Sequence, residues 1–407
     1  TTFFSYTGDD LYKKGRYTAT NRKQNSISGD VGANYSIDFG KNLFFFNAQM
    51  NWSRQKYDYY TVIAQGLPND KLDHITQAVE YYNTKPSGSE GITQDMGLVG
   101  SVNYSFDEKY LVDLNYRLTG SSDFGSDNRW GHFWSAGVGW NLHREKFMEW
   151  SEDWLNLFKI RLSTGYTGSQ GFNSYDAVST ILYNTATTYN GQLGAYVNSL
   201  ANDALAWQKK YDNNFGVDFG FLKNRLTGRF ELYESTTKGT ITTVTTPPSM
   251  GFNSYVANLG EVQNKGWELY LTGRVWQQKA TGSYVNLYAA FAANKNKLKK
   301  VSNSLKTIND MTDAEYDADA SNTSVPVRYE EGSSLTTIWA VKSLGIDPQT
   351  GREVFVKKDG TQTYDWSAAD YVDCGDTQPG ISGNFGVNAE YKGFGLSLGF
   401  IWQSEYL

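Results

Sequence analysis

The 407-residue sequence contains little cysteine, histidine or proline. Its one cysteine, Cys374, cannot form an intrachain disulfide, and a single thiol excludes a metal cluster held by several thiolates. The three histidines, His74, His132 and His143, stand far apart and lack the spacing of metal ligands. We therefore expect neither a metal site nor a disulfide framework.

Long apolar runs and basic runs are also missing. No stretch approaches the roughly 18 apolar residues of a membrane helix. The net charge is −6 and no lysine-rich or arginine-rich run occurs, so we expect no nucleic-acid partner. A mean hydropathy of −0.54 is typical of a water-soluble protein. Strands that cross a membrane, however, need only alternate residues to be apolar, so this average does not exclude a membrane barrel.

Motifs of common enzymes are absent as well. The sequence contains no nucleophile elbow and no phosphate-binding loop, so we expect neither an enzyme nor any cofactor. The acidic stretch at residues 317–321 resembles a calcium loop only in part. Asn322 stands where the loop needs glycine, and Arg328 stands where it needs glutamate, which favours an ordinary solvated loop.

Aromatic residues and glycine are abundant instead. The sequence has 29 Tyr, 22 Phe, 12 Trp and 40 Gly. Aromatic side chains suit pleated surfaces, and glycine suits turns and the close approach of strands. The composition therefore indicates an all-β protein.

Apolar and polar residues alternate along many segments. At residues 26–38, Ile27 and Val31 share one face, whereas Asp30 and Asn34 share the other. A period of two places side chains on opposite faces of a sheet. About 12 such strands are predicted, with room for one or two more between residues 335 and 356. They begin near residues 26, 44, 96, 110, 131, 157, 213, 226, 265, 282, 384 and 394.

The lengths of strands and loops separate a membrane barrel from a soluble sandwich. The strands run for about 10–15 residues, beyond the usual 5–6 of globular strands. Their connections are short at one end and long at the other, as in outer-membrane barrels. The short ones lie near residues 38–42, 107–109, 223–225 and 392–393, and the long ones at 60–92, 167–212, 235–264 and 297–334. Aromatic residues flank the short turns, where they would form an interfacial girdle: Phe39, Phe44, Phe106, Tyr110, Tyr391 and Phe394.

These features predict a transmembrane antiparallel β-barrel with short periplasmic turns and long extracellular loops. A large two-sheet sandwich or an adhesin array is the alternative. Charged residues in the strands fall on the polar face, because a basic residue on the lipid face costs roughly 2–4 kcal/mol at the midplane. We expect five of them to line the lumen: Asp30, Asp113, Arg117, Arg229 and Glu231.

Residues 110–147 read YLVDLNYRLTGSSDFGSDNRWGHFWSAGVGWNLHREKF and resemble the barrel of SusC/RagA-type TonB-dependent outer-membrane transporters. Further marks follow in the family's order at residues 157–170, 214–226, 248–268 and 375–385. The residues that carry the main motif are Phe124, Gly125, Asn128, Arg129, Trp130 and Gly131. A structural lock of a tight loop is favoured for this motif over contact with cargo through Asp123, Asp127 and Arg129.

The resemblance implies a 22-stranded barrel in the bacterial outer membrane, surrounded by outer-membrane lipid. Residues 1–407 would be part of that single barrel domain. An N-terminal plug domain and a segment that contacts the TonB complex would lie outside this chain. The family also implies a SusD-like surface lipoprotein over the extracellular mouth, and import of a bulky nutrient. An oligosaccharide is the favoured cargo and a peptide the second choice.

A passive porin or a structural surface barrel is the alternative function. Aromatic rings with amide neighbours suit the apolar faces and the hydroxyls of sugars, so the long loops are the predicted cargo-binding surface. These rings could equally pack the loops against one another and against the lid. The predicted cargo-binding residues are Tyr81, Tyr82, Tyr175, Tyr183, Tyr189, Tyr196 and Trp207.

Overall fold

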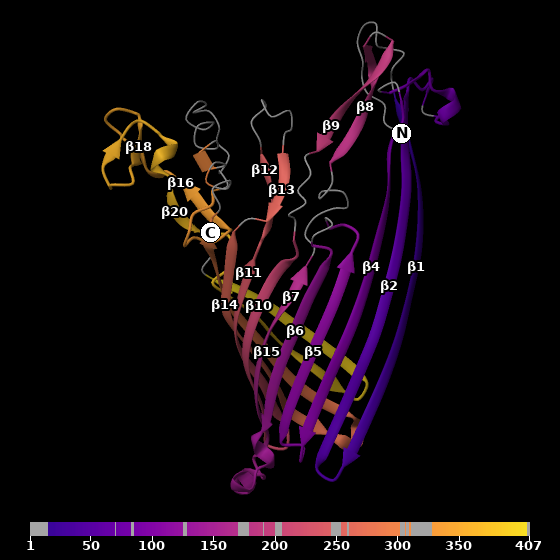
Figure 1. Ribbon diagram of the computed structural model, residues 1–407. Helices are drawn as coiled ribbons and strands as arrows, with labels where there is room; N and C mark the ends of the chain where they lie inside the picture. The colour runs from indigo at the N-terminus through magenta and orange to yellow at the C-terminus, as the bar shows by residue number, and fades with distance from the viewer. Residues whose placement is uncertain are drawn as a thin grey trace.

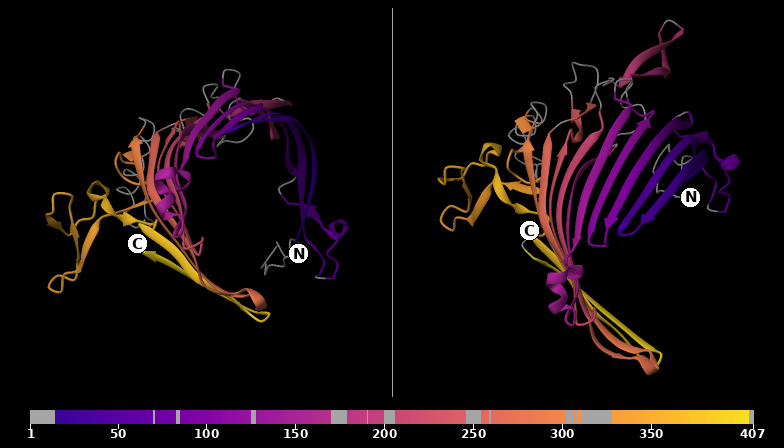
Figure 2. Two further views of the ribbon diagram at one scale, coloured as in Figure 1. Left: turned by 90° about the horizontal axis from the view of Figure 1, so that it is seen from below. Right: turned by 60° about the horizontal axis from the view of Figure 1, so that its bottom comes forward.

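The structure is a computed structural model dominated by one antiparallel sheet of 13 strands (Figure 1). Twelve strands of this sheet follow one another in a single row of hydrogen-bonded neighbours, which we call the main path, and the thirteenth, β3, pairs only with β2. The described residues are 15–69, 71–82, 85–124, 128–169, 179–189, 191–199, 206–245, 254–258, 260–301, 306, 309–310 and 328–404. Seen along the strands, the sheet curves into an open arc (Figure 2).

The path strands are 11 to 24 residues long. In path order they are β1 (Arg16–Phe39), β2 (Asn42–Gln65), β4 (Ser87–Phe106), β5 (Tyr110–Ser121), β6 (Trp130–Asn141), β7 (Leu155–Ser169), β10 (Gln208–Phe221), β11 (Leu226–Lys238), β14 (Glu261–Gln278), β15 (Ser283–Lys300), β21 (Ile381–Tyr391) and β22 (Phe394–Ser404). The predicted count of about 12 strands is therefore confirmed.

The strand register sorts the side chains into two faces. Directly paired residues share a face, so one row of the apolar face runs Tyr35–Phe46–Val102–Leu114–Ala136 across β1 to β6. Farther along the path, a second apolar row runs Phe219–Gly228–Leu271–Ala289–Phe385. The predicted alternation thus holds across the whole sheet.

The polar face is built in the same way from the interleaved positions. Its rows carry amides and hydroxyls, as in Asn34–Asn47–Ser101–Asn115–Ser135. Asn47 Nδ2 donates to Asn34 Oδ1 at 2.6 Å, and Asn115 Nδ2 donates to Ser135 Oγ at 3.3 Å. These hydrogen bonds join the polar faces of neighbouring strands.

Within the part of the chain that the structure describes, no second layer covers the apolar face of the sheet. Val31 is 74% exposed and Leu162 is 52% exposed, although both belong to apolar rows. The buried clusters lie at the long-loop end instead. One contains Val262, Leu298 and Val301, and the other contains Trp339, Ala368 and Tyr371. A soluble sandwich would bury such a face between two sheets, so this exposure favours a lipid-facing surface.

Shorter strands lie outside the main path. At the long-loop end lie β3 (Glu80–Tyr81), the hairpin β8 (Thr180–Tyr189) with β9 (Gln192–Ser199), and the pair β12 (Ile241–Thr245) with β13 (Ser254–Asn258). A further excursion contains β16 (Thr337–Ala340), β17 (Lys342–Ile346), β18 (Glu353–Val356), β19 (Gln362–Thr363) and β20 (Val372–Asp376). The strands predicted between residues 335 and 356 exist, but they belong to two small separate sheets and not to the main path.

The helices whose bounds lie within the described residues are short 3-10 turns. They are η2 (Ile75–Gln77), η3 (Leu142–Arg144), η4 (Lys146–Ser151), η6 (Lys279–Thr281) and η7 (Ala368–Asp370). No helix among the described residues is long and apolar enough to cross a membrane.

The strands extend farther into the long-loop end than the alternation predicts. β2 continues to Gln65, and β10 begins at Gln208, five residues before the predicted start at residue 213. Parts of the predicted loops 60–92, 167–212 and 235–264 are therefore strand. Beyond the apolar band both faces of a strand contact water, so the period of two fades from the sequence while the hydrogen-bond ladder continues.

Candidate functional site

A charge network on the polar face joins three neighbouring strands. Arg161 of β7 donates to both carboxylate oxygens of Asp218 on β10, from Nε at 2.8 Å and from Nη2 at 3.2 Å. The same Nη2 donates to Glu231 of β11 at 2.8 Å. Arg229 completes the group through its Nε, 2.9 Å from Asp218 Oδ1. Each carboxylate meets at least one guanidinium, so the four charges compensate one another.

A glycine allows Arg161 to reach across β10. The register places Gly216 directly between Arg161 and Glu231. A Cβ atom at position 216 would lie 2.8 Å from Arg161 Nη2, too close for the guanidinium to stay in place. The absence of a side chain therefore creates the channel in which the arginine crosses the middle strand.

The predicted lumen residues are divided between this network and simpler positions. Arg229 and Glu231 belong to the network. Asp113 accepts a hydrogen bond from Asn103 Nδ2 at 2.5 Å on the polar face. Asp30 pairs with Asn51 in the register of the same face. Arg117 donates from Nε to Thr119 Oγ1 at 2.8 Å, nearer the long-loop end.

A hollow of about 490 Å³ lies beside Arg117 on the polar face. Its walls include Asn115, Ser135, Phe133 and Trp207. The structure thus brings together one predicted lumen residue, Arg117, and one predicted cargo-binding residue, Trp207. Phe133 was not among the predicted site residues, although a large aromatic residue in a polar row was the available signal.

The family motif packs against this hollow. Phe124 is 1% exposed and stacks on Trp207, with ring centroids 4.2 Å apart. Phe133 meets the other edge of Trp207 in a T-shaped contact at 5.5 Å. The backbone N–H of Ser121 donates to the carbonyl of Arg129 at 3.2 Å, which closes the loop. These contacts agree with a structural lock, and they also fix the position of the Trp207 ring.

The remaining motif residues surround the start of β6. Trp130 and Gly131 pair with Gly120 and Thr119 of β5. Asn128 lies just before β6, and Gly125 falls outside the described residues. The loop motif therefore forms the entry to a strand.

Those predicted loop aromatics that the structure describes lie on segments other than the one that carries Trp207. Tyr183 and Tyr196 are exposed on the β8–β9 hairpin, which projects from the long-loop end (Figure 1). Tyr81 is exposed in β3, and Arg16 stacks over Tyr82 with its Cζ 3.8 Å from the ring centroid. Tyr175 lies outside the described residues, as does the side chain of Tyr189.

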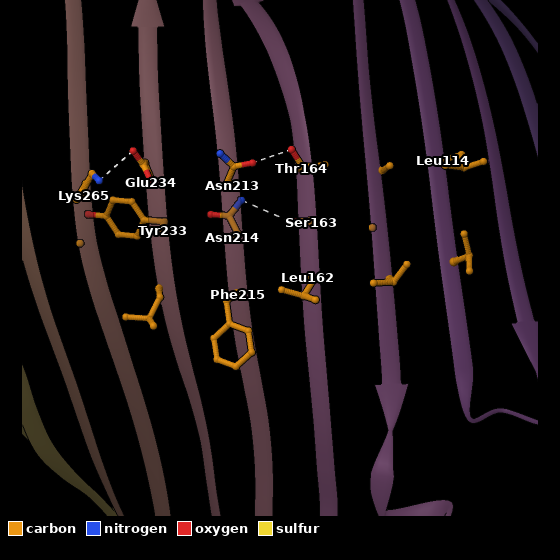
Figure 3. Close-up of a pocket in the computed structure, with 16 residues that line it drawn as sticks. Leu114, Leu162, Ser163, Thr164, Asn213, Asn214, Phe215, Tyr233, Glu234 and Lys265 are labelled. Atoms are coloured by element: carbon orange, nitrogen blue, oxygen red, sulfur yellow. Dashed lines mark hydrogen bonds and ion pairs between the residues drawn. The ribbon is translucent and has the colours of Figure 1, made fainter. Parts of the chain in front are cut away.

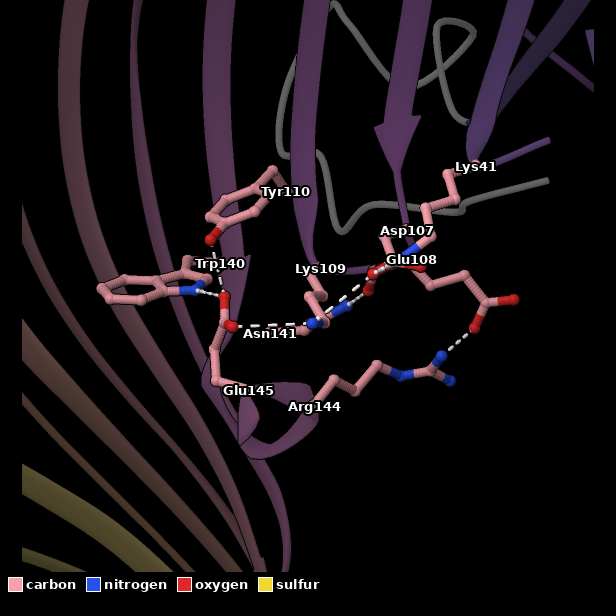
Figure 4. Close-up of polar contacts among 9 residues, drawn as sticks. All are labelled: Lys41, Asp107, Glu108, Lys109, Tyr110, Trp140, Asn141, Arg144 and Glu145. Carbon is pink, nitrogen blue, oxygen red and sulfur yellow. Dashed lines mark hydrogen bonds and ion pairs between the residues drawn. The ribbon is translucent and has the colours of Figure 1, made fainter. Parts of the chain in front are cut away.

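The short-turn end carries a second charge network (Figure 4). Asp107 pairs with Lys41 at 3.0 Å and with Lys109 at 3.4 Å. Lys109 Nζ lies 3.6 Å from Glu145 Oε2, and Glu145 accepts a hydrogen bond from the hydroxyl of Tyr110 at 2.7 Å. Three turns that are separate in sequence are thereby connected at this rim.

The same contacts shift the acidity of the rim carboxylates. The hydrogen bond from Lys41 lowers the pKa of Asp107 from its ordinary value of 3.8. The hydrogen bonds from Tyr110 and then Trp140 lower the pKa of Glu145 from 4.5. Both groups stay ionised at neutral pH. Among the described residues, no set of three or more His, Cys, Asp or Glu side chains is arranged to hold a metal ion.

The long tilted strands, the asymmetric ends and the bare apolar face together define an outer-membrane β-barrel. Residues 1–403 match the family model described as TonB dependent receptor-like, beta-barrel, and the chain belongs to that family. Its relatives are outer-membrane proteins, so the apolar face contacts lipid and the polar face points inward.

Named relatives agree with this assignment. The TonB-dependent receptor P39 of Formosa agariphila is 28% identical over 360 residues, which are 84% of this chain and 32% of that protein. The TonB-dependent receptor SusC of Bacteroides thetaiotaomicron is 34% identical over 182 residues, 43% of this chain and 18% of SusC. The aligned region spans about a third or less of these relatives' length.

Solved structures share the fold. The RagAB peptide transporter matches with a TM-score of 0.78 at 24% identity, over 95% of this chain and 42% of that chain. The crystal structure of the outer-membrane transporter YddB from Escherichia coli matches more distantly, with a TM-score of 0.51 at 10% identity, over 94% of this chain and 42% of that chain. The resemblance to a SusC/RagA-type barrel is therefore confirmed.

Proposed function

We propose that the full-length protein is a TonB-dependent importer that carries an oligosaccharide through this barrel. A SusD-like surface lipoprotein would cover the extracellular mouth, and the TonB complex would act through a segment outside this chain. The observation that carries the proposal is the inward-facing hollow beside Trp207 in a barrel of this transporter family.

The chemistry of the hollow suits a sugar. Trp207 offers aromatic surface to the C–H face of a pyranose ring, and the buried Phe133 supports the Trp207 ring from one side. Arg117, Asn115 and Ser135 supply donors and acceptors for hydroxyl groups. Most cargo sites combine an apolar surface with a few placed polar groups in this way. The exposed tyrosines of the β8–β9 hairpin would add a first contact surface nearer the loops.

A peptide is the second candidate cargo. The RagAB structures that share this fold carry the description of a peptide importer. A guanidinium such as that of Arg117 would pair with a carboxylate of a peptide. This candidate predicts that binding depends on Arg117 more strongly than on Trp207.

The inward charges would serve the same route. Asp30, Asp113 and Arg117 would line the path of the cargo. Arg229 and Glu231 would either line it or hold the plug domain. A hydrated lumen accommodates these charges at little cost, whereas the lipid face would not.

The test uses the full-length protein in nanodiscs, titrated with libraries of labelled oligosaccharides and labelled peptides. For a sugar cargo, Trp207→Ala should weaken binding about tenfold, and Arg117→Gln should have a smaller effect. The matched control is Trp150→Ala, because Trp150 is an exposed aromatic at the short-turn end. Equal affinity of Trp207→Ala and wild type would contradict the proposed site.

A separate measurement addresses the passive alternative. The same preparation is inserted into a planar bilayer, and co-purifying chains are identified by mass spectrometry. An importer should insert without steady conductance and should bring a surface lipoprotein in stoichiometric amount. Steady ion conductance from a barrel that purifies alone would overturn the importer in favour of a passive pore.

A further inference from the structure

Five lysines gather on the lipid-facing side of β10, β11, β14 and β15, and we call them the outer lysine patch. The apolar row Leu232–Trp267–Ala293 is followed, two residues farther along each strand, by the row Glu234–Lys265–Lys295. All five lysine side chains are exposed. The patch consists of Lys209, Lys238, Lys265, Lys295 and Lys297.

The register sets like charges against one another inside this patch. Lys265 pairs directly with Lys295, and Lys209 pairs directly with Lys238. Like charges at directly opposite positions of a strand pair are destabilising. Among the described residues, Glu234 forms an ion pair with the patch, 3.1 Å from Lys265 Nζ, and Glu261 stands opposite Lys238 in the register. Five lysines against these two carboxylates leave an excess of positive charge that suits an anionic ligand.

The patch stands at the extracellular edge of the membrane. Glu234 lies eight residues above Leu226, where β11 begins at its short turn. Eight residues span about 26 Å of strand, or about 20 Å along a barrel axis at the usual tilt. The lipid-facing apolar band is about 25 Å tall. The lowest lysines therefore start about 5 Å inside the outer edge of this band, and their long side chains reach the headgroups of the outer leaflet.

An apolar groove of about 700 Å³ begins directly below the patch. Figure 3 shows Lys265, Glu234 and Thr164 in one row above Phe215 and Leu162. Small residues such as Ala136 keep the groove open between the larger side chains of its floor. Its width and apolar floor suit an acyl chain lying along the barrel wall.

A polar hollow lies on the other side of the same lysines. It measures about 630 Å³ and is lined by Lys265 and Lys295 together with Ser333, Ser334, Gln378 and the carboxylates of Asp373 and Asp376. Hydroxyl, amide and carboxylate groups of this kind bind sugar hydroxyls. The apolar groove and the polar hollow thus meet at Lys265, which lines both of them.

We propose that this surface binds a phosphate-bearing glycolipid of the outer leaflet, of the lipid A type. An acyl chain would occupy the groove beside Ala136, and a phosphate would sit between Lys265 and Lys295. Lys209, Lys238 and Lys297 would meet further anionic groups, and the sugar hydroxyls would face the hollow at Ser333 and Ser334. Continuity with the lipid-facing surface and the charge of the patch select this ligand.

The test measures lipid binding to the full-length protein in nonionic detergent by native mass spectrometry. The probes are bisphosphorylated lipid A, its monophosphorylated form and phosphatidylcholine. Wild type should prefer the three in that order. The double variant Lys265→Gln with Lys295→Gln should bind bisphosphorylated lipid A roughly thirty-fold more weakly. Glu234→Gln should bind it more tightly, because the competing carboxylate is gone.

Matched controls separate the patch from general charge effects. Lys223→Gln removes the same charge from the short turn between β10 and β11, at the opposite membrane surface, and should bind as wild type does. Ala136→Phe should fill the groove and weaken binding, whereas Ala48→Phe on the same face outside the groove should not. Migration of unheated samples in gel electrophoresis checks that each barrel is folded.

Two outcomes would overturn the proposal. One is equal affinity of wild type and the double lysine variant for bisphosphorylated lipid A. The other is a double variant that keeps its lipid affinity but loses a co-purifying surface protein, which would make the patch a protein interface. Neither outcome depends on transport, so the proposed importer function is tested independently.

Discussion

The inward and outward faces of the sheet from β7 to β15 differ in how their charges are paired. On the inward face, Arg161 meets Asp218 and Glu231, and the guanidiniums are matched by carboxylates. Glu231 also stands opposite Glu268, but Arg161 donates a hydrogen bond to Glu231 and so reduces the repulsion between the two carboxylates. On the outward face, Lys265 stands opposite Lys295, and an ion pair on this face joins Lys265 to Glu234 over 3.1 Å.

The inward charges stabilise the fold, whereas the outward charges are available to bind a ligand. A compensated network contributes to the folded state, and its loss should appear as lost stability. The outer lysine patch, with its excess of positive charge, lowers the free energy of unfolding until an anionic ligand binds. The predictions below test this contrast, beginning with the largest expected effect.

Loss of Asp218 should produce the largest change. The variant Asp218→Ala leaves Arg161 and Arg229 without their shared carboxylate. In the wild type the Asp218 side chain is only 14% exposed. Breaking such a pair by removing one partner should lower the free energy of unfolding by about 2–4 kcal/mol. Urea unfolding of the detergent-solubilised barrel measures this, with Asp30→Ala as the control on the same face. Equal stability of the two variants would refute the special role of the network.

Gly216→Ala should act on the same network from the backbone side. The added Cβ would displace the Arg161 guanidinium, so unfolding should become easier by about 1–2 kcal/mol. Gly100→Ala is the matched control, because a Cβ at Gly100 meets no atom within 4 Å. The control should be neutral or slightly stabilising through the unfolded chain. A neutral Gly216→Ala would mean that Arg161 does not need its channel.

Lys209→Gln should change stability in the opposite direction. In nonionic detergent without anionic lipid, it relieves the opposition with Lys238 while Lys238 keeps its position opposite Glu261, and it should raise the free energy of unfolding by about 0.3 kcal/mol. Added bisphosphorylated lipid A should stabilise wild type more than the variant. The same urea experiment, with and without the lipid, gives both values. A variant that is less stable without lipid would contradict the like-charge conflict.

The rim network should give the smallest effect, visible only in acid. The pKa values of Asp107 and Glu145 are lowered by folding, so their contribution is present above the ordinary values of 3.8 and 4.5. It is lost as the pH falls through the lower folded pKa values. Thermal unfolding between pH 5 and pH 2.5 should therefore show a small extra drop in wild type. Asp107→Asn with Glu145→Gln should lack this drop, and a variant that keeps it would show that other groups are responsible.

Much of the fold could be predicted because the lipid imposes a simple rule on each strand. In the membrane, one face must be apolar, so alternation marks both the strands and their faces. The predicted strands at residues 110, 226 and 394 begin where the structure begins them. Above the membrane this rule no longer applies, and the prediction ended β2 at about residue 59, before its last residues up to Gln65.

The site was less predictable for a different reason. Trp207 stacks on Phe124, although 82 residues separate them in sequence, and no local pattern indicates that contact. Arg161 reaches Glu231 only because Gly216 lies between them in the register. The exposed tyrosines on the loops remain predicted cargo-binding residues, and they lie on several separate loops.

Composition and alternation by themselves determined that this chain is a membrane sheet with an apolar and a polar face, because lipid contact is enforced strand by strand. Sequence order also determined which strands are neighbours, since each short turn joins adjacent antiparallel strands. Only the tertiary structure decided which residues of distant strands stand side by side. The register between strands depends on every ladder in the sheet, and it is the register that compensates the inward charges and leaves the outward lysines opposed.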